Sequence, residues 1–424
     1  MGEIIKLFVY LQLLLSLTAI NPPSHSMSLL DAFYRTHAYL IQHTPAGVRR
    51  MLMDEIDWND RLIGIKGTRG VGKTTFLLQY AKEKFPLDDR QCLYINMNNF
   101  YFQGRGITAF AGEFVKQGGR VLLIDQVFKD HNWSQELRQC YDSYPQLKIV
   151  FTGSSVMRLK EENPEIGKIV KSYNLRGFSF REFINIKTGL QLPAYTLEEI
   201  LLRNGEIQRE ILSRVSPKQY FQDYLHHGFY PFFQEQRNYS ENLLKTMNMI
   251  TEVDILLIKQ IELKYLPKIK KLFYLLACNA SKTPNISILA REIQTSRATV
   301  MKYIKYLADA RLINILYRNE ETLHKKPARV MLHNTNLMYA IYPIQVKQQE
   351  VMQTFMLNAL WDKNTVNSTE KPDTFVLNKD RRLIIYDALG SKQPTQKEDN
   401  IYIRYNTEIG RNNHIPLWLL GFLY

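Results

Sequence analysis

A glycine-rich octapeptide constrains the fold of this chain more than any other feature. It reads Gly67-Thr68-Arg69-Gly70-Val71-Gly72-Lys73-Thr74, the spacing G-x-x-x-x-G-K-T. A short strand-like run, residues 61–66, precedes it, and residues 75–81 open a helix with an apolar face. Strand, glycine loop and helix together place backbone N–H groups and a helix N-terminus around a phosphate. The sequence therefore predicts a nucleoside triphosphate as the ligand and a parallel α/β sheet as the scaffold.

The residue types of this loop fit that ligand. Glycines allow the chain to curl with positive φ and to lie close to the phosphates. Lys73 would reach the β- and γ-phosphates, and the Thr74 hydroxyl would ligate Mg²⁺. A glycine turn with a chance lysine is the alternative, and the flanking strand and helix argue against it. The residues expected to bind ATP are Gly67, Thr68, Arg69, Gly70, Val71, Gly72, Lys73, Thr74 and Thr75.

A second element follows at residues 120–126. Its continuous apolar run is typical of a buried parallel strand, and Asp125 stands at the carboxyl end, where open α/β sheets bind ligands. We expect Asp125 and Thr74 to hold Mg²⁺. Many hydrolysing ATPases have a water-orienting Glu at the next position, which here is Gln126. Because an amide cannot act as a base, this catalytic set is degenerate and hydrolysis is in doubt.

A third strand is expected over residues 147–155 and ends in small hydroxyl residues. Thr152 and Ser154 could sense the γ-phosphate from this position. A Gly/Ser turn that merely closes the strand is an equal alternative.

Length and composition bound the class of protein. A chain of 424 residues is expected to form two or three domains. Three cysteines without paired spacing argue against disulfides or a zinc site and fit the cytoplasm. A net charge of +14 fits nucleic acid, an acidic partner or only a basic surface. Residues 1–26 hold an apolar run too short to span a membrane. We interpret them as an over-extended or signal-like N-terminus before a start at Met27, and expect no membrane association.

Residues 268–320 carry the pattern helix, short helix, turn, helix and strand, which is the layout of a winged helix-turn-helix. Ser296 is well placed to cap the third helix. Lys302 and Lys305 would lie on its exposed side, where they could contact DNA. Many winged helices bind proteins instead, so both readings stay open.

Further motifs follow in order: Phe178–Phe183, Gly228–Phe232 and the apolar terminal segment Ile415–Tyr424, which must pack against something. With the phosphate loop, they resemble the bacterial and archaeal AAA-like ATP-binding proteins that carry an uncharacterised C-terminal domain, their Bacteroides-type members above all. The resemblance implies an α/β fold with an AAA+-like P-loop NTPase core. A helical and winged-helix region and a small restriction-endonuclease-like α/β domain would follow.

On this reading the chain divides into five segments. They are residues 1–26, the ATP-binding domain at 27–190, a helical linker or lid at 191–265, the winged helix at 266–330 and the nuclease-like domain at 331–424.

The chain departs from those relatives at four functional positions. They are Gln126 for a Glu, Lys168-Ile169 for an arginine pair, Ala388 for an acidic residue, and Met352–Phe355 for an Arg-Glu-Thr-Phe motif. A missing arginine finger lowers phosphoryl transfer by ~10³–10⁵-fold. A nuclease needs several carboxylates for its metal, so the terminal domain is expected to be inactive.

Three hypotheses follow. The first is an ATP-binding protein with impaired or slow hydrolysis that acts as a nucleotide-gated conformational switch. The second is an active ATPase of the same fold, in which Ser154 or Glu113 holds the water. The third is a DNA-associated regulator that works through the winged helix. A protein partner or a homo-oligomer is compatible with each.

Overall fold

The computed structural model describes residues 29–424 except 46, 236–237, 280–281, 319–325, 391–393, 395–396 and 398–399. Residues 1–26 and Met27 therefore lie outside the described part of the chain. No helix within it is both long and apolar enough to cross a bilayer.

A five-stranded parallel sheet forms the first part of the fold, in the order β2-β3-β4-β1-β5. Its strands are β1 (Leu62–Gly67), β2 (Cys92–Asn96), β3 (Val121–Asp125), β4 (Lys148–Ser154) and β5 (Lys171–Asn174). Alternate side chains of these strands enter two different apolar clusters, one on each face. The sheet is therefore buried on both sides, as continuous apolar strands require.

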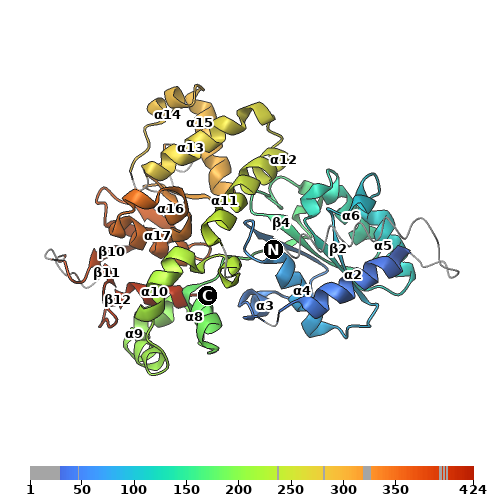
Figure 1. Ribbon diagram of the computed structural model, residues 1–424, viewed down its shortest axis with the longest axis horizontal. Helices are drawn as coiled ribbons and strands as arrows, with labels where there is room; N and C mark the ends of the chain where they lie inside the picture. The colour runs from blue at the N-terminus through green and yellow to red at the C-terminus, as the bar shows by residue number, and fades with distance from the viewer. Residues whose placement is uncertain are drawn as a thin grey trace.

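Helices cover both faces of this sheet (Figure 1). They and the short helices between them are α2 (Leu29–His43), α3 (Leu52–Glu55), α4 (Lys73–Lys84), η2 (Phe100–Phe102), α5 (Ile107–Lys116), η3 (Val127–Lys129), α6 (Trp133–Ser143) and α7 (Pro164–Gly167). Because parallel strands end at one edge, Gly67 lies beside Ser154 and Asn96 beside Asp125.

A helical region follows the sheet. It consists of α8 (Phe180–Thr188), α9 (Leu197–Leu212), α10 (Lys218–Asp223), η4 (Tyr224–Gly228), η5 (Pro231–Gln234), α11 (Tyr239–Met249), η6 (Ile250–Ile255), α12 (Leu256–Ile258) and η7 (Leu263–Tyr265). The side chains of Ser179 and Glu182 form a reciprocal capping box at the start of α8. η4 and η6 are π-helical turns.

Three helices and a strand pair come next: α13 (Leu266–Cys278), α14 (Ile286–Glu292), α15 (Arg297–Asp309), β6 (Ile313–Leu316) and β7 (Arg329–Leu332). The side chain of Ser296 accepts a hydrogen bond from Thr299 N, which confirms it as the N-cap of α15. β6 and β7 are antiparallel. This arrangement is compatible with the winged-helix interpretation, which stays a prediction.

The last part holds a mixed sheet in the order β12-β11-β10-β9-β8. Its elements are α16 (Thr335–Ile341), η9 (Pro343–Gln345), α17 (Gln348–Leu360), β8 (Val366–Ser368), β9 (Thr374–Leu377), β10 (Arg381–Asp387), β11 (Asn400–Tyr405), β12 (His414–Pro416) and η10 (Leu417–Phe422). The terminal apolar segment is buried, and Phe422 contacts Phe180 of α8. The expectation that this segment packs is confirmed.

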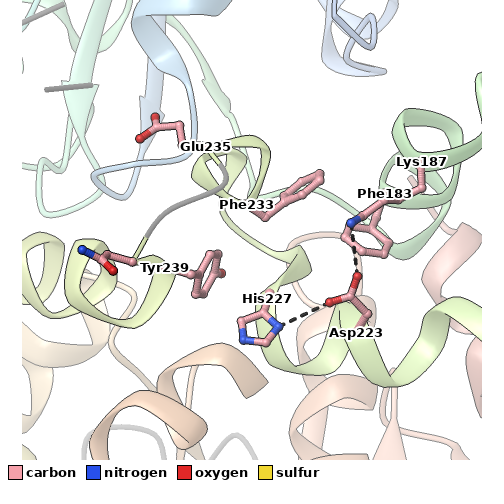
Figure 2. A pocket seen from close by; sticks show the side chains of 8 residues that line it. Phe183, Lys187, Asp223, His227, Phe233, Glu235 and Tyr239 are labelled. Atoms are coloured by element: carbon pink, nitrogen blue, oxygen red, sulfur yellow. Dashed lines mark hydrogen bonds and ion pairs between the residues drawn. The ribbon is translucent and has the colours of Figure 1, made fainter. Parts of the chain in front are cut away.

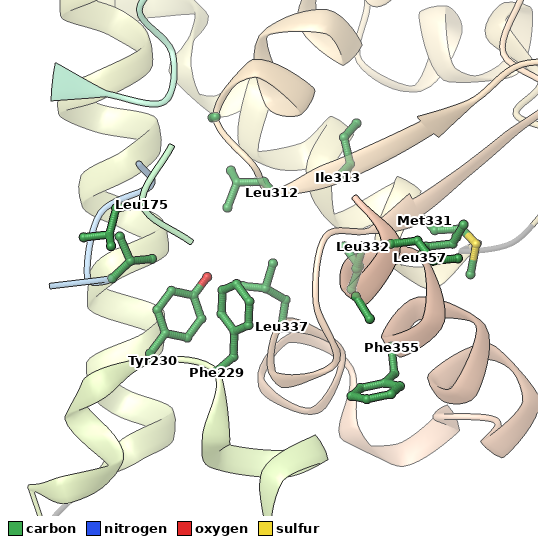
Figure 3. Packing of buried hydrophobic residues seen from close by; sticks show 14 of the residues in the cluster. Leu175, Phe229, Tyr230, Leu312, Ile313, Met331, Leu332, Leu337, Phe355 and Leu357 are labelled. Atoms are coloured by element: carbon green, nitrogen blue, oxygen red, sulfur yellow. The ribbon is translucent and has the colours of Figure 1, made fainter. Parts of the chain in front are cut away.

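One cluster of buried apolar side chains runs through all of these parts, from Ile41 to Phe422. Figure 3 shows part of this cluster, where Tyr230 and Phe229 lie close to Leu337, with Leu332 and Phe355 beyond. We call it the shared core.

Candidate functional site

The phosphate-binding loop joins the end of β1 to the start of α4. Gly70 has φ +85° and Gly72 has φ +94°, in the left-handed region that favours glycine. A Cβ on Gly67 would lie 2.5 Å from the carbonyl oxygen of Leu175, so no larger residue fits there. The curl expected from the motif is thus present, and it is followed directly by a helix N-terminus.

The Lys73 ammonium lies inside this curl. Its Nζ donates to the carbonyl oxygens of Gly67 and Thr68 at 2.8 and 2.9 Å. Burial lowers the pKa of Lys73 to about 8, while the carboxylates of Asp254 and Asp125 oppose the shift. An entering phosphate would supply the anionic partner that this buried cation lacks in the loop itself.

Asp125 gathers several hydrogen-bond donors at the carboxyl edge of the sheet. Its Oδ2 accepts from Thr74 Oγ1 at 2.7 Å, Tyr94 OH at 2.9 Å and Asn96 Nδ2 at 3.2 Å. Its Oδ1 accepts from the hydroxyl of Thr152. Thr74 and Asp125, the two expected Mg²⁺ ligands, therefore lie together. Oxygen donors of this kind suit Mg²⁺.

The two sensor candidates serve different carboxylates. Thr152 accepts a hydrogen bond from Gln126 N at 2.9 Å besides donating to Asp125, so it orients the end of β3. Ser154 donates to Oδ2 of Asp254 at 3.1 Å. Gln126 itself adopts φ +57°. Glu113 is exposed on α5 and joins none of the described contacts around Asp125.

The second half of the chain covers the loop. A Cβ on Gly70 would lie 3.4 Å from the rings of Tyr230 and Phe232, and one on Gly72 would lie 3.5 Å from Pro231. Thr68 Oγ1 donates to the carbonyl oxygen of Ala310 at 3.2 Å. The motif Gly228–Phe232, singled out in the sequence, therefore packs against the phosphate-binding loop.

Arg69 and Asp254 form an ion pair across this contact. Arg69 Nη2 lies 2.6 Å from Asp254 Oδ1, and Asp254 is only 3% exposed. Sequence reasoning missed Asp254, Tyr94 and Asn96. Asn96 could have been found, because it ends the strand next to Asp125. Asp254 lies in a helical segment, and no local pattern distinguishes it.

Two pockets lie elsewhere. One, of about 240 Å³, is lined by residues that include Phe183, Phe233 and Tyr239. Figure 2 shows Asp223 at its wall, 3.3 Å from both Lys187 Nζ and His227 Nδ1. The other, of about 260 Å³, lies beside it, and neither includes a residue of the phosphate-binding loop.

The remaining expected residues lie away from the loop. Lys302 and Lys305 are exposed on α15, and Lys168 is exposed after α7. Within the described ranges, no three or more His, Cys, Asp or Glu side chains gather as a group that could hold a metal.

Comparison with known proteins bears on the first part of the chain most directly. Residues 59–184, which include the loop and Asp125, match the family model of an AAA domain. The first part of the chain is similar to an AAA domain. Residues 218–346 match a domain of unknown function. An uncharacterized protein of Methanocaldococcus jannaschii is 25% identical over 280 residues, which are 62% of this chain. The match spans 59% of the length of that relative.

Solved structures show only distant similarity to this chain. ORC1 of Aeropyrum pernix in complex with DNA has a TM-score of 0.32 and 12% identity, with 76% of this chain and 94% of that one covered. RuvB of Thermotoga maritima has a TM-score of 0.27 and 15% identity, and the match covers 75% of this chain and 98% of that one. AMPPCP-bound DnaA of Aquifex aeolicus has a TM-score of 0.23 and 16% identity, and the match covers 65% of this chain and 87% of that one. The domain match and the parallel sheet give an α/β fold with an AAA+-type P-loop core, a fold that supports nucleotide binding.

Proposed function

We propose that the protein binds Mg-ATP in the loop Gly67–Thr75 and uses it as a conformational ligand, with impaired or slow hydrolysis. Lys73 would hold the β- and γ-phosphates, and Thr74 and Asp125 would hold Mg²⁺. The nucleotide would then change how the loop packs against the second half of the chain.

One observation carries this proposal: four residues of the loop, Thr68, Arg69, Gly70 and Gly72, lie against the second half of the chain. Thr68 bonds to Ala310 at the end of α15, and Arg69 pairs with Asp254 of η6. Gly70 and Gly72 lie against the Tyr230–Phe232 segment. A ligand can shift an equilibrium only through different affinities for its two states. A phosphate that enters this loop meets such contacts directly.

Slow hydrolysis is supported by the end of β3. Gln126 follows Asp125, and its backbone N–H is fixed by the Thr152 hydroxyl. Its side chain is an amide, which cannot accept a proton from water at neutral pH.

The first experiment measures Mg-ATP affinity by calorimetry for the wild type, Lys73→Ala and Lys84→Ala. Lys84 is an exposed lysine on the same helix. We expect Lys73→Ala to weaken binding at least tenfold and Lys84→Ala to leave it unchanged. Equal affinity in all three proteins would remove the basis of the proposal.

A second measurement tests the hydrolysis step. ADP release at saturating ATP should be negligible in the wild type and should rise at least tenfold in Gln126→Glu, since a positioned general base contributes ~10²–10⁴-fold. Lys73→Ala in the Gln126→Glu background should abolish that gain. Steady turnover by the wild type would instead identify an active ATPase.

Hydrogen exchange tests the conformational step. Mg-ATP should change exchange at residues 228–235 and 306–316, which include the loop neighbours Tyr230–Phe232 and Ala310, but not in α9, which is absent from those contacts. Tight binding without any such change would leave an ATP-binding protein and refute the switch.

DNA binding through α15 is a second candidate, favoured by one observation. The exposed Lys302 and Lys305 lie on the helix whose end, at Ala310, is bonded to the loop. Duplex affinity should fall with salt, and Lys302→Ala/Lys305→Ala should reduce the slope of log K against log salt by about 2. Lys84→Ala/Lys116→Ala, on helices of the first sheet, is the matched control. DNA binding that is absent, or that does not depend on salt, would exclude this candidate function.

A further inference from the structure

Asp254 brings a buried negative charge from outside the sheet to the phosphate-binding loop. It belongs to η6, the π-helical turn between α11 and α12. Its two oxygens are bound by elements of the candidate nucleotide site: Arg69 of the loop at 2.6 Å, and Ser154 at the end of β4 at 3.1 Å. Since Gly67 and Ser154 are direct neighbours across β1 and β4, Ser154 lies beside the start of the loop that carries Arg69.

The donors around Asp254 are those that would suit a phosphate. Arg69 and Lys73 are cations of the loop, and Asp254 is the first of the two carboxylates that raise the pKa of Lys73 against the effect of burial. A guanidinium, an ammonium and a hydroxyl are the groups with which proteins hold phosphoryl oxygens.

Two buried donors at this place have no partner among the described residues. They are Arg69 Nε and the hydroxyl of Ser155, whose backbone N–H donates to Gly67 O at 3.1 Å. A carboxylate offers two oxygens, whereas a terminal phosphate offers three and more negative charge. Asp254 therefore satisfies only some of the donors that converge here, and buried donors without partners are uncommon.

We propose that Asp254 is an internal anion that holds the loop in its closed arrangement and is displaced by the terminal phosphate of a nucleoside triphosphate. This inference rests on the proposed nucleotide binding and adds what regulates it. Two anions cannot share one buried site without strong repulsion. Binding of the γ-phosphate would free Arg69 from Asp254 and release η6. Because π-helical turns are rare and recur at functional sites, η6 is a suitable element to move.

The test compares ATP and ADP, because only ATP carries the competing phosphate. Mg-ATP and Mg-ADP affinities are measured for the wild type, Asp254→Asn and Glu252→Gln. Glu252 lies on the same turn at the surface, where its Oε1 forms an ion pair with Lys270 Nζ at 2.5 Å. We expect Asp254→Asn to tighten ATP binding at least tenfold and ADP binding less than threefold, with Glu252→Gln like the wild type.

Two results would overturn the proposal. Unchanged ATP affinity in a folded Asp254→Asn protein would show that the carboxylate does not compete. Equal tightening of ATP and ADP would exclude competition by the terminal phosphate.

A second test uses the wild type alone and therefore does not depend on whether the Asp254→Asn protein folds. Hydrogen exchange at residues 250–258 should rise with Mg-ATP but not with Mg-ADP, and no difference between the two would contradict displacement of η6. Failure of the underlying proposal has a different signature, since Lys73→Ala would then bind ATP as the wild type does.

Discussion

The hydroxyl of Thr74 donates a 2.7 Å hydrogen bond to Oδ2 of Asp125. These are the first residue after the loop lysine and the last residue of β3. The contact places a hydroxyl and a carboxylate where one small cation could lie between them. Thr74→Val keeps the shape of the side chain and removes the oxygen.

We expect Thr74→Val to reduce the Mg²⁺-dependent gain in ATP affinity at least tenfold, because Mg²⁺ would lose a ligand. Calorimetry with ATP in Mg²⁺ and in EDTA measures that gain. Thr36→Val, which removes a hydroxyl bonded to Ala32 O within α2, should keep the wild-type gain. An intact gain in Thr74→Val would exclude Thr74 as a ligand.

ATP affinity should also depend on pH through Lys73. Its pKa is lowered to about 8, so the ammonium of the free protein loses its proton as pH rises through that value. Only the charged form attracts phosphate, and binding should therefore weaken above pH 8, approaching tenfold per unit. Calorimetry from pH 7 to 9 in buffers of different ionisation enthalpy should detect proton uptake on binding. A flat profile without proton uptake would contradict this expectation.

The buried pair Arg50–Glu182 supports the loop from behind. Arg50 Nε lies 3.0 Å from Glu182 Oε1, both side chains are buried, and Arg50 also donates to Val71 O at 3.2 Å. Glu182→Ala leaves a buried charge unpaired, which costs about 3–5 kcal/mol. Denaturant unfolding measures this loss of stability. Asp142→Ala, which breaks an exposed pair with Arg138, should lower stability far less, because solvent screens that pair. Similar costs for both variants would refute the supporting role.

Acid should destabilise the fold through His37. Burial lowers its pKa from 6.5 to about 4, and its Nδ1 accepts a 2.9 Å hydrogen bond from Tyr94 N. As the pH falls, the His37 imidazole is therefore protonated at a higher pH in the unfolded chain than in the folded one. The free energy of unfolding should drop by about 3 kcal/mol between pH 6.5 and pH 4. Unfolding of wild type and His37→Gln between pH 4 and 7 tests this. The variant should lose less on acidification, while the exposed His43→Gln should behave like the wild type.

Local signals in the sequence were sufficient for the loop, the edge of the sheet and the caps. Gly70 and Gly72 have the positive φ that the motif requires, and Ser296 caps α15. Boundaries were less predictable. The helical pattern was expected from residue 268, whereas α13 begins at Leu266, because Pro267 is tolerated in a first helical turn. The strand that closes this pattern, β6, begins only at Ile313, because Arg311 adopts φ +59° and interrupts the chain after α15.

The contacts that close the site could not be predicted in this way. Arg69 and Asp254 are 185 residues apart in the chain, and Thr68 and Ala310 are 242 apart. Such pairs are decided by how whole elements pack, and neither an aspartate in a helical stretch nor an alanine at a helix end carries a local signal. Asn96 differs, since its place at a strand end could have marked it.

The shared core determines whether parts of this chain could fold as separate fragments. Segments 59–184 and 218–346 match separate family models, yet apolar side chains from both belong to the shared core. A fragment ending at residue 190 would leave Phe180 and Phe183 without Tyr224, and Phe180 without Phe422. We expect such a fragment to aggregate rather than fold alone. The two segments would then have to be produced together, because one face of the first sheet packs on the shared core and would be left open in the fragment.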